Sequence, residues 1–395
     1  MDRERFPRMG IAVAHGCRTP PGSVQSYFSH CLSNPDVAGT IAAVRVERTF
    51  SHFDIRPEAI GRRPTMREVA ALAGVSLSTV SRVVNGDGRV DDRLAEQVRH
   101  AVEMLGYRQN VTASSLRRSD HLSASIGLIL EDVSNPFFSL LHRGVEEVAR
   151  ERGVLTFAGS SDEQPDRERE LAGAFAARGA DGLVIAPASG NHGFLERDRA
   201  GGMGVVFVDR PSPSLHADRV LSDNRGGAEA AVAHLIAHGH RRIAFLGDRP
   251  ELFTAAQRFA GYRDALAAAG IPVTQRLVVH LHSLDGQPGA AVHELLTRDD
   301  PPTALFSSQN LITISALRVI HALGLQHRVA LVGFDDISLA DVVEPAVTVV
   351  AQDPGAMGRK AAELLFRRID GDGGAPAEVI VPTPLVVRGS GEIAP

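Results

Sequence analysis

The sequence contains no run of apolar residues long enough to cross a membrane, and its first residues lack the continuous apolar region of a signal peptide. We therefore expect a cytoplasmic protein without a membrane partner. Only two cysteines occur, Cys17 and Cys31, so no disulfide framework supports the rest of the chain. With His15 and His30 they form a possible metal-binding set, but their spacing matches no usual zinc pattern, and we predict no metal site.

The loops that hold cofactors or nucleophiles in common enzyme folds are missing as well. No G-x-G-x-x-G, G-x-x-x-x-G-K or G-x-S-x-G motif follows an expected strand. Asp335 and Asp336 are adjacent carboxylates, but neighbouring residues in an extended turn usually diverge, which does not suit acid–base catalysis. We therefore expect no catalytic residues and no cofactor. An enzyme that uses the later part of the chain, with the early helices as an accessory, is the competing hypothesis.

Lysine is nearly absent, since Lys360 is the single lysine, and arginine supplies the remaining positive charge. The net charge is −5, but it is unevenly distributed. Residues 62–118 hold ten arginines and six acidic residues, a net charge of +4, which leaves −9 for the rest of the chain. A basic segment beside an acidic body fits a DNA-contacting head joined to a domain that does not bind DNA. A length of 395 residues allows two or three domains.

The stretch TMREVAALAGVSLSTVSRVVNG, which begins at Thr65, has the clearest local signals. Thr65 and Glu68 have the spacing of a capping box, which predicts the start of a helix. Gly74 supplies the left-handed residue that ends this helix, and Ser76 is placed to cap a second helix over 77–84. Two short helices joined by a glycine turn indicate a helix-turn-helix, whose second helix enters a DNA major groove. An ordinary αα-hairpin is the alternative that this stretch alone leaves open.

A third helix should follow, because Asp91 can cap an apolar pattern that ends at Gly106. Asn110 can then cap one short helix through Leu116, which is too short to be stable alone and should order on binding. We therefore divide the chain into an N-terminal extension over 1–61, a DNA-binding head over 62–108, a hinge helix and linker over 109–123, a body over 124–390 and a tail over 391–395.

The extension over residues 1–61 has neither helical nor strand periodicity, and several prolines interrupt what pattern there is. We expect it to be disordered or loosely ordered. One hypothesis is that translation naturally begins after it, and an intact mass of the native protein that includes these residues would reject that hypothesis. A variable tail is the alternative.

From residue 124 onward, short apolar segments alternate with amphipathic segments of helical length, which predicts a parallel, doubly wound α/β body. Glycines at positions 153, 179, 239, 270 and 324 stand where helix ends need a left-handed residue. The number of expected strands is larger than one sheet of this kind usually holds. We therefore expect two lobes with a ligand cleft at the carboxyl ends of their strands. The expected strands cover 125–130, 154–158, 182–186, 205–208, 243–246, 277–281, 304–307 and 329–333, with a further strand over 347–350.

Together these features closely resemble the LacI/GalR family of bacterial transcription regulators, over residues 63 to about 390. The helix-turn-helix stretch carries most of the resemblance, and shorter segments extend it through the body. These segments are GYRQNVTASSL, NPFF from Asn135, VDRP around Asp209, DNRGG from Asp223, RFAGY from Arg258 and VGFDD around Asp335. The resemblance implies a DNA-binding head, a body similar to periplasmic sugar-binding proteins, and a role in regulating transcription.

In this family the second helix of the head lies in the major groove, so its side chains are implied to contact bases or phosphates. Leu77 can offer only an apolar contact, for example to a thymine methyl group. Thr65 and Ser76 are placed to contact phosphate, although capping alone explains both. The implied DNA-binding residues are Thr65, Ser76, Leu77, Ser78, Thr79, Ser81, Arg82 and Asn85 in the head, and Asn110 and Leu116 in the hinge.

Leu116 matches the leucine that this family inserts between central base pairs in the minor groove, which exchanges base stacking for a bent duplex. Packing of Leu116 against a neighbouring hinge helix is compatible with the same role. The family usually has proline where this chain has Gln109, and arginine where it has Ser114. At these two positions the resemblance therefore does not carry over the family's hinge folding and one of its DNA contacts.

For the effector cleft, the resemblance implies Phe137, Phe138, Asp209, Arg258, Gln309, Asn310, Asp335 and Gln352. Carboxylates and arginine bond paired hydroxyl groups, and aromatic faces cover the apolar side of a sugar ring, so this set favours a sugar or sugar acid. Gln309 and Asn310 replace the Asn-Asp pair of many members, which keeps amide groups but removes a carboxylate. A surface position for Arg258 and a core position for Phe138 are the alternatives.

The resemblance implies a homodimeric repressor that binds a palindromic operator in double-stranded DNA, because one small head contacts only a half-site. A small molecule in the cleft would change operator affinity by binding two states of the protein unequally. The sequence leaves open whether the effector releases the protein from DNA, as in most such regulators, or recruits it, as in the purine-responsive type. A transport-type binding protein is disfavoured, because it would need an export signal.

Overall fold

The computed structural model describes residues 64–86, 89–108, 123–188, 191–281 and 288–395. The chain divides after Tyr107 into two compact units. The N-terminal extension, the cysteine–histidine set and the hinge positions Asn110 and Leu116 lie outside the described residues. No helix of the described ranges combines the length and the apolarity that crossing a membrane requires.

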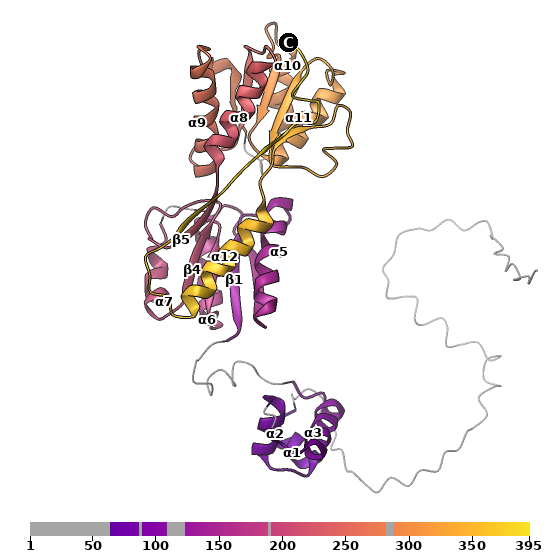
Figure 1. Cartoon of the computed structure of the whole chain (residues 1–395), viewed down its shortest axis with the longest axis vertical. Helices are drawn as coiled ribbons and strands as arrows, with labels where there is room; N and C mark the ends of the chain where they lie inside the picture. The colour runs from indigo at the N-terminus through magenta and orange to yellow at the C-terminus, as the bar shows by residue number, and fades with distance from the viewer. Residues whose placement is uncertain (1–63, 87–88, 109–122, 189–190, 282–287) are drawn as a thin grey trace, which may run out of the picture. The chain divides into compact units, whose positions relative to one another are not determined.

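The first unit contains three helices, α1 (Met66–Ala73), α2 (Leu77–Val84) and α3 (Asp92–Leu105) (Figure 1). The predicted capping box is present, since the Thr65 backbone N–H donates to Glu68 Oε2 at 2.6 Å and the Glu68 N–H donates to Thr65 Oγ1 at 3.4 Å. Gly74 ends α1 with a φ of 65°, and the Ser76 hydroxyl accepts from the Thr79 N–H at the start of α2. The expected helix-turn-helix and third helix are therefore confirmed.

The head has a small core. Val69, Val80, Val98 and Ala101 are its buried apolar residues, one from α1, one from α2 and two from α3. Each helix thus depends on the other two for the burial of its apolar face, as expected of helices too short to be stable alone.

The second unit is an α/β body of two lobes. Lobe 1 contains β1 (Ser125–Leu130), α5 (Pro136–Glu151), β2 (Leu155–Ser160), α6 (Pro165–Ala177), β3 (Gly182–Ile185), η4 (Gly193–Leu195), α7 (Glu196–Ala200), β4 (Gly204–Val208), β5 (Asp218–Ser222), α12 (Pro354–Ile369) and β11 (Glu378–Val381). Lobe 2 contains α8 (Asn224–Ala237), β6 (Ile243–Gly247), α9 (Phe253–Ala268), η5 (Gln275–Leu277), β7 (Val278–His280), α10 (Pro288–Thr297), β8 (Ala304–Ser307), α11 (Asn310–Ala322), β9 (Ala330–Phe334), β10 (Thr348–Val350) and β12 (Leu385–Val386).

Each lobe is built on one six-stranded sheet, with the order β11-β5-β4-β3-β1-β2 in lobe 1 and β12-β10-β9-β8-β6-β7 in lobe 2. All pairings are parallel except that of β10 with β12. The chain crosses between the lobes after β5, after β10 and after β11, so α12 and β11 complete lobe 1 although they follow lobe 2 in sequence (Figure 1). The predicted parallel, doubly wound, two-lobed body is confirmed.

Helices cover both faces of each sheet. In lobe 1, α5 and α12 enclose one apolar core and α6 encloses the other. In lobe 2, α8 and α9 cover one face, and α10 and α11 cover the opposite face. Because both faces are buried, the central strands are continuously apolar, as in the buried SIGLIL of β1.

The close crossing of α5 and α12 depends on two glycines. A Cβ atom at Gly144 would lie 2.2 Å from the Gly355 carbonyl oxygen, and one at Gly358 would lie 2.1 Å from the Leu141 carbonyl oxygen. Neither backbone oxygen can move away cheaply, so only glycine fits at these two positions.

The expected strands were found with small shifts of their ends, but three strands were missed. β5 follows β4 after a loop that contains no helix, and β11 and β12 are short edge strands whose pairing depends on distant residues. The segment over 391–395, expected to be a tail, packs on lobe 2, where Glu392 pairs with His234 and the Ile393 carbonyl accepts a hydrogen bond from His240 at 2.7 Å. The end of the chain is thus part of this lobe.

A buried ion pair joins α12 to the sheet of lobe 1. Asp218 accepts hydrogen bonds from Arg368 Nε at 2.6 Å, from Arg368 Nη2 at 2.8 Å and from the Ala377 N–H at 2.6 Å. Burial by itself would raise the pKa of Asp218, but these hydrogen bonds and the charge of Arg368 outweigh it and lower the pKa.

We expect Asp218→Asn to remove part of the acid sensitivity of the body. Because the folded pKa of Asp218 is lowered, its contribution to stability is present above the unfolded pKa and is lost as the pH falls through the folded pKa. At pH 7 the variant should therefore be less stable, by about 1–3 kcal/mol, the cost of losing a hydrogen-bonded charge. As the pH falls through the folded pKa of Asp218, the urea midpoint of the variant should approach that of the wild type. Parallel pH profiles would contradict this role.

Candidate functional site

The helix α2 buries one face and exposes the other. Val80 is fully buried, and Val83 and Val84 pack against the same core. Leu77 is 46% exposed. The opposite face therefore presents the predicted side chains Leu77, Ser78, Arg82 and Asn85 to solvent, with Thr79 and Ser81 partly exposed.

Some polar groups on this face already form hydrogen bonds within the head, whereas others do not. Ser76 Oγ lies 2.8 Å from both Ser78 Oγ and Thr79 Oγ1, and the Asn85 amide donates to the Ser81 carbonyl at 2.7 Å. The Arg82 guanidinium has no hydrogen bond or ion pair with a described residue. Arg82 is thus the cation on α2 with its full donor set free for a phosphate or a guanine.

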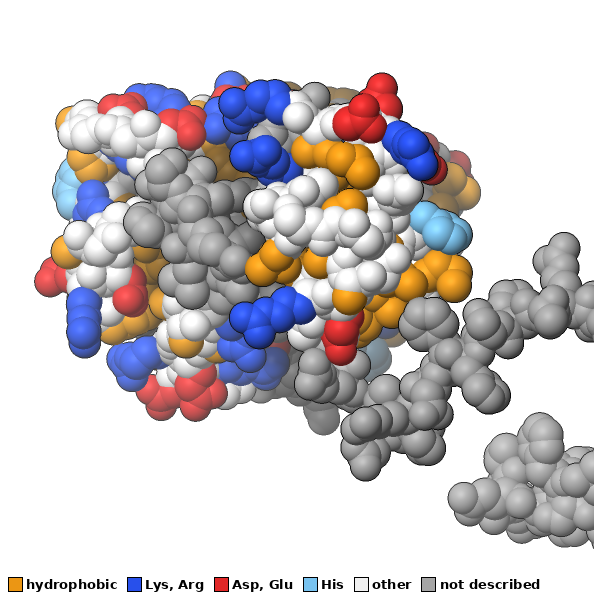
Figure 2. All heavy atoms as spheres, turned by 90° about the horizontal axis from the view of Figure 1, so that it is seen from below, with side chains coloured by type: hydrophobic (Ala, Val, Ile, Leu, Met, Phe, Trp, Pro, Cys, Tyr) orange, Lys and Arg blue, Asp and Glu red, His pale blue; other side chains and the backbone are white. Residues whose placement is uncertain are grey.

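Positive charge is dispersed over the face of the molecule that Figure 2 shows. The Lys and Arg side chains form separate groups, with acidic, polar and apolar side chains between them (Figure 2). Within the head, Arg67, Arg82, Arg93 and Arg99 are distributed over all three helices, so recognition of DNA would depend on the placement of individual side chains.

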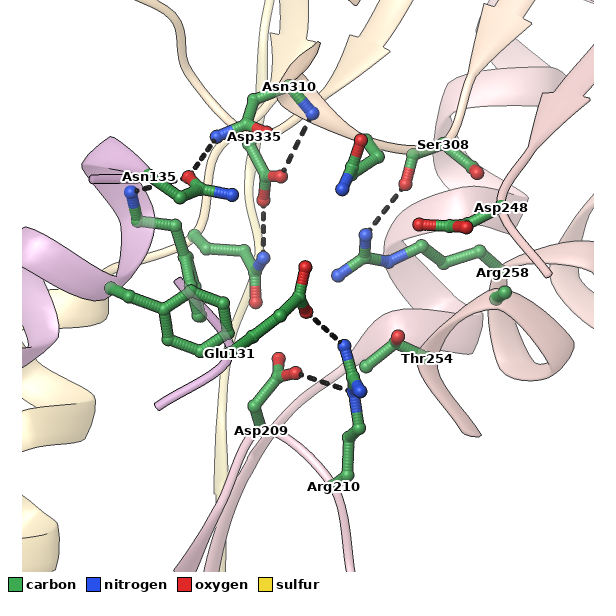
Figure 3. A pocket seen from close by; sticks show the side chains of 15 residues that line it. Glu131, Asn135, Asp209, Arg210, Asp248, Thr254, Arg258, Ser308, Asn310 and Asp335 are labelled. Carbon is green, nitrogen blue, oxygen red and sulfur yellow. Dashed lines mark hydrogen bonds and ion pairs between the residues drawn. The ribbon is translucent and has the colours of Figure 1, made fainter. Parts of the chain in front are cut away.

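The interlobe cleft lies where the carboxyl ends of the two sheets face each other. Glu131 follows β1 and Asp209 follows β4 in lobe 1, whereas Asp248 follows β6 and Asp335 follows β9 in lobe 2. Its lining residues are Glu131, Asn135, Phe137, Phe138, Asp209, Arg210, Asp248, Thr254, Ala255, Arg258, Ser308, Gln309, Asn310, Asp335 and Gln352 (Figure 3). All eight residues predicted for the effector cleft are among them.

Arg258 is held rigidly on the lobe 2 side. Its Nε donates to Asn224 Oδ1 at 2.8 Å and its Nη1 donates to the Ser308 carbonyl at 2.6 Å, while the guanidinium lies 3.9 Å from the centre of the Phe334 ring. Burial lowers the pKa of Arg258, although Asp335 and Asp209 oppose that shift. The alternative of a surface arginine is wrong, since Arg258 is buried and its guanidinium is directed into the cleft (Figure 3).

Asp335 is the matching carboxylate in lobe 2. It accepts a hydrogen bond from the Asn310 N–H at 3.2 Å and another from the Gln352 amide. Burial raises the pKa of Asp335, against the opposing charge of Arg258 and these hydrogen bonds. Asp336 points elsewhere and pairs with Arg388, so the two adjacent carboxylates diverge as predicted.

Two cleft carboxylates have strained backbones. Asp209 has a φ of 66° and Asp335 a φ of 73°, in the left-handed region that non-glycine residues seldom adopt. Such positions cost of the order of 1–3 kcal/mol each and cluster at ligand sites. This backbone conformation directs both carboxylates into the cleft at the points where their strands end.

Arg210 forms a second buried charge centre, on the lobe 1 side. It pairs with Glu131, with Glu163 at 3.0 Å and with Asp209 at 3.2 Å. Burial alone would lower the pKa of Arg210, but Glu131 and Asp209 together raise it. For Glu131, burial prevails over Arg210 and raises the pKa.

The lobes touch directly across the cleft. The Asn310 side-chain amide of lobe 2 donates to Asn135 Oδ1 of lobe 1 at 2.8 Å, and Arg249 of lobe 2 pairs with Glu163 of lobe 1. The space left between the lining side chains is about 30 Å³, enough for one or two water molecules. A larger ligand can enter only if these contacts between the lobes open.

Several buried polar atoms of the cleft lack a hydrogen-bond partner among the described residues. They are Ser308 Oγ, Gln309 Oε1 and Gln352 Oε1. An unsatisfied buried polar atom costs about 1–3 kcal/mol, so each is a position where a ligand hydroxyl group would be stabilised.

Sequence reasoning missed seven lining residues, among them Glu131, Arg210, Asp248 and Ser308. Three of these four directly follow a strand, and Arg210 is the second residue after one. All four therefore lie on the edge where parallel α/β sheets bind ligands. Their position was therefore a usable signal. The prediction of Phe138 in the cleft and its alternative in the core both hold, because Phe138 is buried in the lobe 1 core and also lines the cleft.

One side-chain arrangement resembles the Ser-His-Glu triad of hydrolases. His192 Nδ1 lies 2.9 Å from Ser212 Oγ, and His192 Nε2 lies 2.9 Å from Glu168 Oε1. His192 and Glu168 are completely buried, and none of the three lines the interlobe cleft. Since no substrate can reach the hydroxyl group, the arrangement is part of the lobe 1 core.

Comparison with known proteins agrees with this architecture. Residues 65–110 match the model of bacterial regulatory proteins of the lacI family, and residues 232–391 match the periplasmic binding protein-like domain. The HTH-type transcriptional regulator CelR of Thermobifida fusca is 35% identical over 341 residues, which are 84% of this chain and 99% of CelR. The chain belongs to the LacI/GalR family of bacterial transcriptional regulators. GalR of Escherichia coli is 32% identical over 314 residues, 78% of this chain and 89% of GalR.

Solved structures of family members have the same fold. A complex of the transcriptional regulator CelR with cellobiose is 34% identical and covers 83% of this chain and 100% of that one, with a TM-score of 0.61. A lac repressor dimer bound to operator and an anti-inducer is 23% identical, covers 84% of this chain and 100% of that one, and has a TM-score of 0.74. This family member is accordingly a DNA-binding transcriptional regulator and not an enzyme.

Proposed function

We propose that this family member is a homodimeric repressor whose operator affinity is controlled by a neutral sugar bound in the interlobe cleft. The observation that carries the proposal is the set of buried polar atoms without a partner among the described residues, Ser308 Oγ, Gln309 Oε1 and Gln352 Oε1, beside the fixed side chains of Arg258 and Asp335. Hydroxyl groups both donate and accept hydrogen bonds, so a polyol can satisfy amide oxygens, a carboxylate and a guanidinium together. The related CelR was solved with cellobiose, which supports a sugar.

The charge of the cleft favours a neutral ligand over a sugar acid. Four carboxyl groups line it, those of Glu131, Asp209, Asp248 and Asp335, against two guanidinium groups. With all of them ionised, the lining has a net charge of −2. A carboxylate ligand would add a like charge to this buried site, which is unfavourable. Of the two ligand classes that the sequence suggested, we therefore retain the sugar.

A panel of ligands tests this choice. Binding to the full-length protein is measured by calorimetry for neutral mono- and disaccharides, beginning with cellobiose, and for the corresponding sugar acids. We expect one neutral sugar to bind at least about tenfold more tightly than its acid, a difference of about 1.4 kcal/mol. Tighter binding of the acid would show that the net charge of the lining does not select the ligand.

The contacts between the lobes couple sugar binding to operator affinity. A sugar is much larger than the present space, so its entry must break the Asn135–Asn310 hydrogen bond or the Glu163–Arg249 ion pair. The open and closed arrangements then bind the sugar with different affinity, which linkage requires of an effector. We infer that this rearrangement reaches the DNA-binding heads through the segment that joins them to lobe 1, and that the sugar releases the operator.

A homodimer is supported by an apolar face on lobe 1. Leu155 and Phe157 alternate on the edge strand β2 and are 65% and 48% exposed. An uncovered edge strand with apolar side chains invites association, and a second copy is the partner that a symmetric operator requires. We therefore assign the dimer contact to this face.

We expect the double variant Leu155→Asp, Phe157→Asp to be monomeric. Two carboxylates on each face would repel across the interface and remove its apolar contact. Sedimentation velocity should show half the wild-type mass, and operator affinity should fall by about tenfold or more, because each monomer can contact only one half-site. Val273→Asp alters an exposed valine of lobe 2 away from this face and should leave the mass unchanged. A double variant with the wild-type mass would place the dimer contact elsewhere.

A further inference from the structure

Lobe 2 has a second cavity, at the end of its sheet opposite to the interlobe cleft. It lies where β6 begins, at Ile243, whereas the cleft lies where the strands end. Its volume is about 570 Å³, within the range of small-molecule sites. We name it the amino-end cavity, lined by Arg241, Arg242, Ile243, Tyr262, Leu266, Gly270, Ile271, Pro272, Thr274, Arg276, Leu277, Arg298, Asp299 and Asp300.

The inner part of the cavity is apolar. Ile243, Tyr262 and Leu266 are buried residues of the lobe 2 core. The Tyr262 hydroxyl donates to the Ile243 carbonyl at 2.9 Å, which fixes its ring, and burial raises the pKa of Tyr262 to about 12. Ile271, Pro272 and Leu277 add apolar surface. A ring of a ligand would therefore lie against Ile271, Pro272 and Leu277, with the three buried side chains behind them.

The rim of the cavity is basic. Four arginines and two aspartates line it, a net charge of +2. Arg242 pairs with Asp300 at 2.5 Å, and Arg298 Nη1 donates to the Arg276 carbonyl at 2.8 Å, which holds that guanidinium at the rim. The guanidinium groups of Arg241 and Arg276 have no hydrogen bond or ion pair with a described residue.

The backbone does not cancel this charge. The carboxyl end of α9 lies at the cavity, and helix carboxyl ends carry partial negative charge. Its last carbonyls are, however, already bonded, since the Gly270 N–H donates to the Ala267 carbonyl and the Ile271 N–H to the Leu266 carbonyl. Full guanidinium charges then prevail over the residual dipole at the rim.

We propose that the amino-end cavity is a second ligand site, separate from the interlobe cleft, for a phosphate monoester carried on a ring. The net charge of +2 matches the two negative charges of such a phosphate near neutral pH. Guanidinium groups bind phosphate oxygens through paired N–H donors. The apolar inner surface receives the ring, and binding here would give the regulator a second input besides its sugar.

The test uses full-length protein and calorimetry with adenosine 5′-monophosphate, adenosine and inorganic phosphate. We expect the nucleotide to bind at least about tenfold more tightly than adenosine, since the phosphate carries most of the binding energy. Inorganic phosphate should compete with it. Absence of nucleotide binding, or equal binding of adenosine, would overturn the proposal, as would tighter binding of the dicarboxylate phthalate.

Variants locate the site. Arg241→Ala with Arg276→Ala should weaken nucleotide binding by about tenfold or more, whereas Asp299→Asn, which removes a negative charge from the rim, should strengthen it. Arg263→Ala, an exposed position on α9 outside the cavity, is the matched control and should change nothing. All four substituted positions are exposed, so folding should be preserved, and thermal midpoints check it. Loss of nucleotide binding in the cleft variant Arg258→Ala, with the rim variants unaffected, would assign the nucleotide to the cleft and overturn the proposal.

Discussion

Arg258→Ala is expected to abolish the response to the effector while leaving operator binding intact. The side chain is buried and is fixed by Asn224 and the Ser308 carbonyl, and it keeps further N–H donors directed into the cleft. Two hydrogen bonds from a charged donor to a sugar are worth about 3 kcal/mol together, so effector affinity should fall by about 100-fold. Operator affinity without effector should stay within about twofold, because the head is a separate compact unit.

The substitution also leaves Asp335 without its opposing charge, so loss of stability must be separated from loss of binding. Arg258→Lys keeps the charge but loses the planar fork, and its effector affinity should lie between those of the wild type and Arg258→Ala. Calorimetric unfolding of both variants shows whether the body is folded at the assay temperature. Arg263→Ala, exposed on the same helix, should behave as the wild type. Unchanged effector affinity in a folded Arg258→Ala protein would remove Arg258 from the site.

Val80→Asp is expected to abolish operator binding while leaving effector binding intact. Val80 is fully buried in a head core whose other buried apolar residues are Val69, Val98 and Ala101. An unpaired carboxylate at this position costs several kcal/mol, of the order of 3–5, which is close to the whole stability of so small a domain. The head should unfold, and the operator affinity of the full-length protein should fall by more than about 100-fold.

Leu72→Asp provides the comparison for this variant. Leu72 is 48% exposed on α1, so an aspartate there remains in water and the head should unfold at the wild-type temperature. Sugar binding by the body should be the same in both variants and in the wild type, because the body has its own cores. Retention of operator binding by Val80→Asp would mean that the packing of α2 is not needed for DNA recognition.

Local signals were read correctly from the sequence because they depend on residues close together in the chain. The capping box of Thr65 and Glu68 and the glycine that ends α1 are both present as expected. The glycines after the body helices, such as Gly153 and Gly270, have positive φ. The parallel sheets follow from the alternation of apolar and amphipathic segments, and the carboxyl-end rule then places the cleft.

Features that depend on distant residues were not foreseen. Glu163 pairs with Arg210 and Arg249, and these contacts exist only because three loops meet at the cleft. The edge strand β11 is only four residues long, and it is held by pairing with β5, which lies more than 150 residues earlier in the chain. The burial of Asp218 beside Arg368 likewise depends on the return of α12 to lobe 1. No local pattern predicts such pairings.

The central claim is that a neutral sugar in the interlobe cleft controls operator affinity. Its most direct test is the operator affinity of the purified full-length protein, measured by fluorescence anisotropy on DNA from the region upstream of its own gene while neutral sugars are added. We predict that one sugar weakens operator binding by at least about tenfold, and that it has no effect on Arg258→Ala. Operator binding that no sugar changes, or that changes equally in Arg258→Ala, would contradict the account.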